Sequence, residues 1–106
     1  MPIINLDKGK YENVIKKGIV LVDYYADWCG PCKMLGPVLE QLAKERSDIQ
    51  IVKVNIEKHE NIVRKLSIMS VPTLILYKNG ELQSIKQGFC TIEMLHEWID
   101  EFIALQ

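Results

Sequence analysis

The chain is 106 residues long, with 48% hydrophobic and 25% charged residues, which is typical of one globular domain, here residues 1–106, around a single core. Its 13 Lys and Arg nearly balance 14 Asp and Glu, and the net charge of −1 argues against binding to nucleic acid or to an anionic membrane. No apolar run approaches the roughly 20 residues that span a bilayer, and the first residues lack the pattern of a secretory signal. With only three cysteines, an odd number, we expect a cytoplasmic protein rather than a secreted disulfide scaffold.

The first half of the chain alternates between predicted strands and helices. A short strand at Ile3–Leu6 precedes a helix that Asp7 can cap and Gly18 can end. The near-continuous apolar run Ile19–Tyr25 is typical of a central strand that is covered on both faces. This alternation predicts parallel strands joined by crossover helices.

The second predicted helix begins at Pro31 or Cys32 and runs to about Arg46. Proline suits the first helical position because its missing N–H would be unpaired there anyway. Pro37 falls inside this helix and should kink it, since it cannot donate to the carbonyl of Lys33. The apolar stripe of the helix consists of Met34, Leu35, Val38, Leu39, Leu42 and Ala43.

The second half predicts a strand, a short helix, a hairpin and a last helix. Asn79-Gly80 is the strongest short-range signal for a tight turn between two strands, and Thr91 can cap the final helix. A mixed sheet of about five strands with helices on both faces satisfies the whole order. The predicted elements are a strand at Ile49–Ile56, a helix at Glu60–Leu66, hairpin strands at Thr73–Tyr77 and Glu81–Gln87, and a helix with Ile92, Leu95, Ile99, Phe102 and Ile103 on one face.

The most informative stretch is residues 28–33, which read Trp-Cys-Gly-Pro-Cys-Lys. Two thiols three positions apart can close a small disulfide ring and open it again. Cys29 lies where a strand ends and a helix begins, beside unpaired N–H groups and the positive end of the helix dipole, a field that favours the nucleophilic thiolate. The motif therefore indicates dithiol–disulfide exchange. We expect Cys29 to be the more exposed, attacking thiol and Cys32 to be the more buried one, which attacks the mixed disulfide in turn.

Two other interpretations of the cysteine pair are a structural disulfide and half of a zinc site. Zinc would need a fourth ligand beyond the three cysteines, and neither His59 nor His96 belongs to a second ligand pair. We therefore expect neither a metal nor another cofactor. Cys90, just before the Thr91 cap, is expected to be a small packing residue rather than a redox or dimer-forming thiol.

Asp23 and Lys53 each interrupt a strand that is otherwise apolar. An unpaired buried carboxylate is costly, and desolvation would raise the pKa of Asp23, which suits it to accept a proton from Cys32. The alternative is a carboxylate that is satisfied by hydrogen bonds or by Lys53 and has no catalytic part. Lys53 either tunes the redox site or is structural, and both interpretations stay open.

Five segments, in order and spacing, resemble the thioredoxin family over essentially the whole chain. The resemblance implies the thioredoxin fold, an α/β fold of three layers with a central mixed five-stranded sheet in the order 1-3-2-4-5 and four helices. It also implies a thiol–disulfide oxidoreductase that reduces protein disulfides and is recycled by a thioredoxin reductase. A monomer is the simplest expectation, and the sequence leaves the oligomeric state open. The segments are Val22-Asp23-Tyr24-Tyr25-Ala26, residues 28–33, Lys53-Val54-Asn55, Val71-Pro72-Thr73 and the Lys78-Asn79-Gly80 turn.

The resemblance also assigns roles to further residues. Gly30 and Pro31 determine how easily the disulfide ring forms, and this pair is associated with reductants. Pro72 is expected to be a cis proline packed against the disulfide, which would leave the backbone of Val71 free to pair with an extended substrate segment. A shallow apolar groove for the substrate chain would be completed by Trp28, Gly88 and Phe89.

Two residues depart from the family pattern. Tyr25 stands where an aromatic residue, often Trp, is usual, so it keeps the bulk but adds a hydroxyl. Asp27 places an acid two residues before Cys29, where a negative charge opposes thiolate formation. A different class of function, in which the fold serves as a non-catalytic binding subunit, is disfavoured by the presence of both cysteines together with Asp23 and Pro72.

Overall fold

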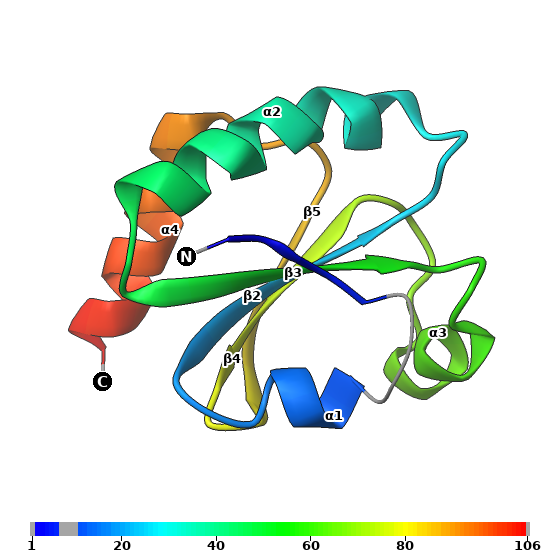
Figure 1. Cartoon of the computed structure of the whole chain (residues 1–106), viewed down its shortest axis with the longest axis horizontal. Helices are drawn as coiled ribbons and strands as arrows, with labels where there is room; N and C mark the ends of the chain where they lie inside the picture. Colours follow the sequence, from blue (N-terminus) through cyan, green and yellow to red (C-terminus); the bar gives the residue numbers. More distant parts are fainter. Residues whose placement is uncertain (1, 7–10, 106) are drawn as a thin grey trace.

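The computed structural model describes residues 2–6 and 11–105, within which five strands form one mixed sheet through the centre of the molecule (Figure 1). The strands are β1 (Ile4–Asn5), β2 (Ile19–Tyr25), β3 (Ile49–Asn55), β4 (Thr73–Lys78) and β5 (Glu81–Gln87). Their order is β1-β3-β2-β4-β5; β1, β3 and β2 are parallel, and β4 is antiparallel to both β2 and β5. The expected strand order is confirmed.

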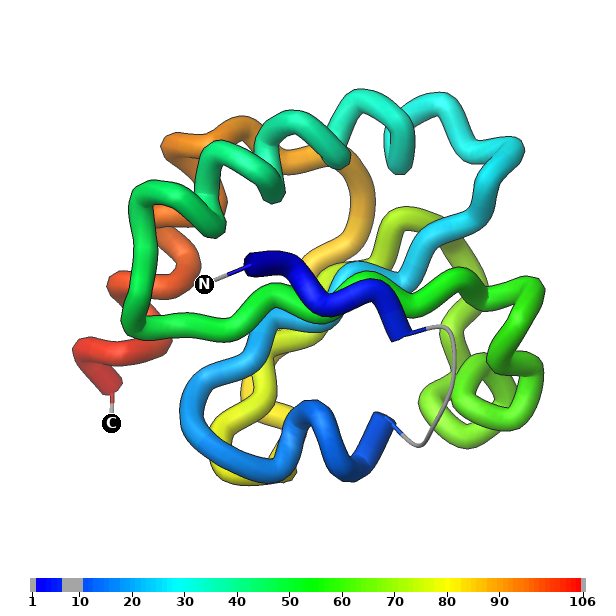
Figure 2. Tube along the Cα trace, viewed as in Figure 1, coloured from blue at the N-terminus to red at the C-terminus, as the bar shows by residue number. Residues whose placement is uncertain are grey.

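Helices cover both faces of this sheet, as the trace in Figure 2 shows. On one face lie α2 (Gly30–Glu45) and α4 (Ile92–Ala104), and on the other lie α1 (Tyr11–Val14) and α3 (Glu60–Leu66). Each face buries a core of its own, because a sheet with apolar side chains on both sides must be covered on both. The result is the three-layer α/β/α architecture expected from the sequence.

The central strand β2 divides its side chains between the two cores. Leu21 belongs to the core beneath α2 and α4, whereas Val20, Val22 and Tyr24 belong to the core beneath α1 and α3. Since successive side chains of a strand point to opposite faces, Asp23 lies on the same face as Leu21. The sequence pattern of β2 therefore directs a carboxyl group toward the layer that contains α2.

The helix α1 ends earlier than predicted. It ends at Val14, and the chain then bends to reach Gly18, which has a φ of +71°. The N–H of Gly18 donates to Oδ1 of Asn79 at 2.8 Å, and its carbonyl accepts from the N–H of Asn79 at 2.9 Å. This contact with a distant turn competes with continued helix. The predicted cap, Asp7, lies outside the described residues.

Other element boundaries differ only slightly from the prediction. The strand expected at Ile3–Leu6 comprises Ile4–Asn5, and α2 begins at Gly30, one residue before the expected Pro31. The helix α2 continues past Pro37 and is assigned as a single helix from Gly30 to Glu45.

Both predicted local signals in the second half are confirmed. Asn79 and Gly80 have φ values of +49° and +88°, so both occupy the left-handed region that a two-residue turn between right-twisted strands requires. Thr91 caps α4, since its side-chain oxygen accepts the N–H of Met94 at 3.2 Å.

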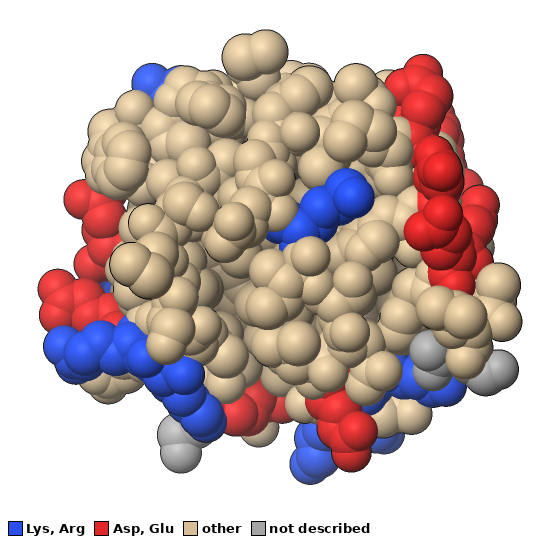
Figure 3. Space-filling model, turned by 180° about the vertical axis from the view of Figure 1, so that it is seen from behind, with Lys and Arg blue, Asp and Glu red and all other residues tan. Residues whose placement is uncertain are grey.

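Figure 3 shows the side of the molecule that faces away from the viewer in Figure 1, on the β5 side of the sheet. Charged side chains are unevenly distributed over this face. Most of this face is neutral, and acidic side chains gather along the edge on which α4 lies in Figure 1. The acidic residues of α4 are exposed and comprise Glu93, Glu97, Asp100 and Glu101.

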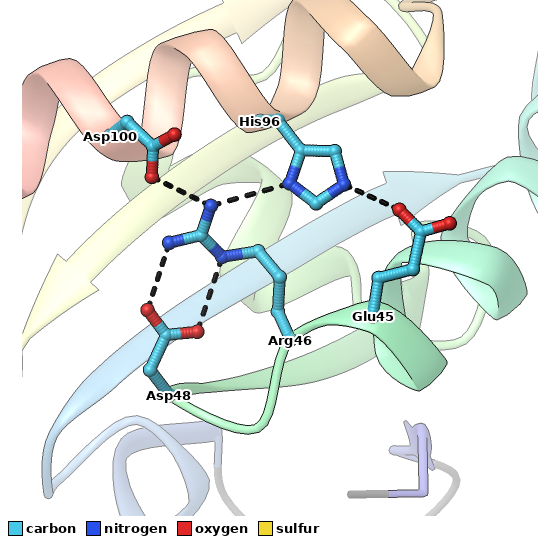
Figure 4. A network of polar contacts seen from close by, with 5 residues as sticks. All are labelled: Glu45, Arg46, Asp48, His96 and Asp100. Atoms are coloured by element: carbon cyan, nitrogen blue, oxygen red, sulfur yellow. Dashed lines mark hydrogen bonds and ion pairs between the residues drawn. The ribbon is translucent and has the colours of Figure 1, made fainter.

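A network of charged side chains connects the end of α2 to α4 (Figure 4). The guanidinium of Arg46 donates to Asp48 at 2.8 and 3.1 Å and to Asp100 at 2.7 Å. It also lies 3.3 Å from Nδ1 of His96, whose Nε2 is 2.7 Å from Glu45. Because arginine can only donate, Nδ1 of His96 is the acceptor and Nε2 carries the proton that is donated to Glu45. The network thus selects one neutral tautomer of His96.

Candidate active site

Cys29 and Cys32 form a disulfide at the amino-terminal end of α2. Cys29 is the N-cap residue, with extended backbone angles, and the N–H of Cys32 donates to its Sγ at 3.2 Å. Gly30 and Pro31 form the first residues of the helix, so the Cα atoms of the two cysteines are 5.2 Å apart. A glycine and a proline therefore bring the sulfurs together without disturbing the helix.

The expectation that Cys29 is the more exposed cysteine is wrong. Cys29 and Cys32 are 4% and 5% exposed, respectively. Segments far from the motif in sequence cover the pair: the carbonyl oxygen of Val71 lies 3.6 Å from Sγ of Cys29, and Ile56 packs against the cysteine cluster. Access to Cys29 therefore depends on the loops around it.

The loop before β4 has the conformation that the resemblance implied. The Val71–Pro72 peptide bond is cis, and Pro72 is buried. The carbonyl of Pro72 accepts the N–H of Gly88 at 2.9 Å, and Gly88 has a φ of +87°, which favours glycine. This hydrogen bond joins the loop before β4 to the loop after β5, both beside the disulfide.

Trp28 directly precedes Cys29 in the chain and is 68% exposed. Phe89, which follows Gly88, is 37% exposed. Exposed aromatic residues therefore lie next to Cys29 in sequence and next to Gly88, whose loop is joined to the Val71–Pro72 loop. The shallow apolar groove expected from the sequence stays a prediction.

Asp23 is completely buried, and no described residue donates a hydrogen bond to either of its carboxylate oxygens. Direct hydrogen bonds from the described residues therefore do not satisfy this carboxylate, and the charge of Lys53 is what compensates it. Lys53 is its direct neighbour on β3, and Leu74 is its neighbour on β4. Burial raises the pKa of Asp23 to about 7, and the nearby positive charge of Lys53 opposes this shift only in part.

The ammonium of Lys53 contacts an aromatic ring rather than hydrogen-bonding to the carboxylate. Its Nζ lies 4.7 Å from the centre of the Tyr25 ring, a cation–π geometry. Tyr25 and Lys53 share the face of the sheet on which Asp23 lies, because strand side chains alternate. The aromatic ring at this position therefore helps to position the lysine.

Asn55 was not assigned a role from the sequence, yet it contacts the acid beside the motif. Its Nδ2 donates to Oδ2 of Asp27 at 3.3 Å, and its Oδ1 accepts the N–H of Glu57 at 2.9 Å. Asn55 is the neighbour of Tyr25 in the register of β2 and β3. The signal that could have indicated this role is a polar residue where two parallel strands end together.

Cys90 is a free thiol that is buried in the core beneath α2 and α4. Its Sγ lies 3.8 Å from the carbonyl of Gly88, and burial raises the pKa of the thiol. The predicted packing role agrees with this environment. Within residues 2–6 and 11–105, no three His, Cys, Asp or Glu side chains form a group that could hold a metal ion. No helix in the same part of the chain is long and apolar enough to cross a membrane.

Comparisons with known proteins agree with this geometry. The thioredoxin family model matches residues 2–101. A thioredoxin from Rickettsia bellii is 41% identical over 99 residues, which is 92% of this chain and 94% of the relative. A thioredoxin from Bacillus subtilis is 36% identical over 104 residues, 97% of this chain and 100% of the relative.

Solved structures show the same fold. Oxidised thioredoxin from Plasmodium falciparum superposes with a TM-score of 0.85 at 27% identity and covers 95% of this chain and 98% of its own. A mutant thioredoxin from Halobacterium salinarum gives a TM-score of 0.85 at 32% identity and covers 93% of this chain and 88% of its own.

A three-layer α/β/α fold with a cysteine pair at the start of a helix and a cis proline beside it defines a thiol–disulfide oxidoreductase. The chain belongs to the thioredoxin family. It reduces protein disulfides by reversible exchange at Cys29 and Cys32, and its oxidised form is recycled by a thioredoxin reductase.

Proposed function

We propose that Cys29 is the attacking nucleophile and that Cys32 resolves the mixed disulfide. The Cys29 thiolate attacks one sulfur of a substrate disulfide, and the second substrate sulfur leaves as a thiolate. The Cys32 thiolate then attacks Sγ of Cys29, which closes the ring and releases the first substrate sulfur. The single observation that carries these roles is the N–H of Cys32 aimed at Sγ of Cys29, at 3.2 Å, on the first turn of α2. In the reduced protein this donor and the helix dipole would stabilise a thiolate on Cys29.

Asp23 is the proton acceptor for Cys32 in this mechanism. Three properties of the Asp23 carboxylate support this role: it is fully buried, its pKa is raised to about 7, and no described residue donates a hydrogen bond to it. A group with such a pKa is half ionised near neutrality and can both take and return a proton there. Lys53, together with Gly30 and Pro31, would tune the site by charge and by ring geometry.

The substrate chain binds across Trp28, Val71, Pro72 and Gly88. Among residues 2–6 and 11–105, no carbonyl accepts the N–H of Val71. An extended substrate segment can therefore pair with this N–H beside Cys29, in the manner of an added strand. The partners in this scheme are protein disulfides and the reductase.

We also infer that the chain works as a monomeric electron carrier in the cytoplasm. The proposed nucleophiles, proton acceptor and substrate-binding backbone all come from one chain, so the site requires no second copy. A free thiol and a single reversible disulfide suit a reducing compartment better than an oxidising one.

The assigned roles are tested by reduction of a protein disulfide, with dithiothreitol as the electron source. Wild type should be active, and Cys29→Ser should have no activity above dithiothreitol alone. Cys32→Ser should accumulate a covalent adduct between Cys29 and the substrate, which mass spectrometry detects. Activity that survives in Cys29→Ser would contradict the proposed roles and would favour a non-catalytic function of the fold.

A further inference from the structure

Met69 is a large apolar side chain that lies almost fully in solvent close to the disulfide. Met69 is 92% exposed and lies two residues before Val71. The carbonyl oxygen of Val71 lies 3.6 Å from Sγ of Cys29. An isolated exposed apolar residue needs no special explanation. Met69, however, lies on the loop that covers the sulfur of Cys29, where a substrate must bind.

Phe89 lies on the second loop beside the disulfide, next to Gly88. The N–H of Gly88 donates to the carbonyl of Pro72 at 2.9 Å, so the two loops are joined. Phe89 is 37% exposed, and Trp28, on the helix side of the pair, is 68% exposed. Three separate segments next to the cysteine pair or to the Val71–Pro72 loop thus carry large, exposed apolar side chains.

The loop that carries Met69 is held at both ends. The N–H of Ile68 donates to the carbonyl of Val63 in α3 at 3.1 Å. The hydroxyl of Thr73, at the start of β4, donates to the carbonyl of Ser70 at 2.7 Å. A side chain on a fixed loop loses less conformational freedom when a partner covers it. Met69 is therefore presented in advance rather than ordered on binding.

Both loops are free of charge. Residues 66–77 and residues 87–92 contain no Asp, Glu, Lys or Arg. Figure 3 shows that most of the face on the β5 side is neutral, with a basic side chain near its centre and the other charged side chains toward its edges. A charged substrate residue covered by these loops would lose water and find no oppositely charged partner on either loop, whereas an apolar residue would gain from burial.

We propose that Met69 and Phe89 make this reductase prefer disulfides whose cysteine has a large, uncharged apolar residue within two positions. The inference rests on the proposed attack by Cys29 and the proposed pairing at Val71. An extended chain advances about 3.3 Å per residue, so two residues carry the substrate about 7 Å from the paired position, toward the loops of Met69 and Phe89. The two uncharged loops also disfavour substrates with a charged residue at this position, because neither loop carries a partner for a buried charge.

The test uses three peptide disulfides that differ only in the residues flanking the cysteine, which are leucine, glutamate or lysine. Second-order rate constants are measured with the pre-reduced full chain in single turnover. The leucine peptide should react about tenfold faster than either charged peptide, the selectivity that one modest apolar contact provides. In Met69→Gln, a change of similar length, this ratio should fall to about threefold or less.

Leu105→Gln is the matched control. Leu105 is also highly exposed, at 85%, but it lies just after α4, far from the start of α2 (Figure 1). This variant should keep the wild-type ratio. A lysine peptide that reacts as fast as the leucine peptide would overturn the inference, and so would an unchanged ratio in Met69→Gln.

A small aromatic disulfide reagent without flanking residues separates this inference from the proposed function. If wild type reduces the reagent but treats all three peptides alike, only the selectivity is refuted. If Cys29 in wild type fails to attack the reagent, the proposed role of Cys29 is itself refuted.

Discussion

Asp23 and Lys53 are directly opposite each other on the parallel strands β2 and β3, yet the carboxylate receives no hydrogen bond from the ammonium. The ammonium lies over the ring of Tyr25 instead. Lys53 therefore acts on Asp23 only through its charge, and burial outweighs that charge in setting the pKa of the carboxyl to about 7. A group that would ordinarily titrate near 3.8 is thus moved into the range where thiol exchange takes place.

The first prediction concerns the rate of exchange in Asp23→Asn. An amide cannot accept the proton of Cys32, so reduction of a protein disulfide should slow by about tenfold or more near pH 7.5. The wild-type rate should rise with pH through an apparent pKa near 7, and the variant should lack this rise. Superimposable rate–pH profiles would show that Asp23 is not the proton acceptor.

The second prediction concerns stability in the same variant. Between the unfolded pKa of 3.8 and the native value of about 7, the native state holds a proton that the unfolded state has released. Wild-type stability therefore falls as pH rises through this window, and the loss is complete above it. The free energy of unfolding of Asp23→Asn should exceed that of wild type more at pH 8 than at pH 5, and the difference between the two pH values should be at most about 3 kcal/mol. Urea unfolding at the two pH values measures this difference, and an equal gain at both would be inconsistent with a raised pKa.

The third prediction concerns Arg46, whose side chain is only 12% exposed. Arg46→Met would leave Asp48, Asp100 and His96 without their shared donor, so stability should fall by about 1–3 kcal/mol. Urea denaturation measures the change. Lys65→Met is the matched control, because Lys65 is exposed and its ion pair with Glu12 is long, at 3.8 Å. A similar loss in both variants would argue against a special contribution from the Arg46 network.

The fourth prediction concerns two buried tyrosines, Tyr24 and Tyr77, whose hydroxyls are 2.9 Å apart in the core beneath α1 and α3. Tyr77→Phe should cost about 1–3 kcal/mol, because it leaves the hydroxyl of Tyr24 buried and unpaired. The double variant Tyr24→Phe/Tyr77→Phe should be more stable than Tyr77→Phe alone, since no polar group is then left without a partner. Thermal or urea unfolding of the three proteins checks the order, and strictly additive losses would contradict it.

The sequence predicted those features that depend on local pattern. The Asn79-Gly80 turn, the Thr91 cap and the central strand Ile19–Tyr25 each follow from neighbouring residues, and all three are present. Asp23 could be recognised because a carboxyl interrupts an apolar run, which local sequence also reveals.

Other features could not be predicted from the sequence, because they depend on contacts between segments that meet only in the folded chain. Cys29 is as buried as Cys32 because Val71, 42 positions away, covers it. The Arg46–Asp100 bond joins residues 54 positions apart, and nothing in either local sequence predicts it. The end of α1 at Val14, before Gly18, is likewise accompanied by the contact between Gly18 and the distant turn.

The most direct test of the account measures how fast each cysteine of the reduced protein is alkylated across a range of pH, resolved by peptide mass spectrometry. Cys29 should react first, with an apparent pKa clearly below the ordinary cysteine value of about 8.5, because the start of α2 stabilises its thiolate. Cys90, whose pKa is raised by burial, serves as the unreactive internal reference. An apparent pKa of about 8.5 or higher for Cys29, or faster modification of Cys32, would contradict the account.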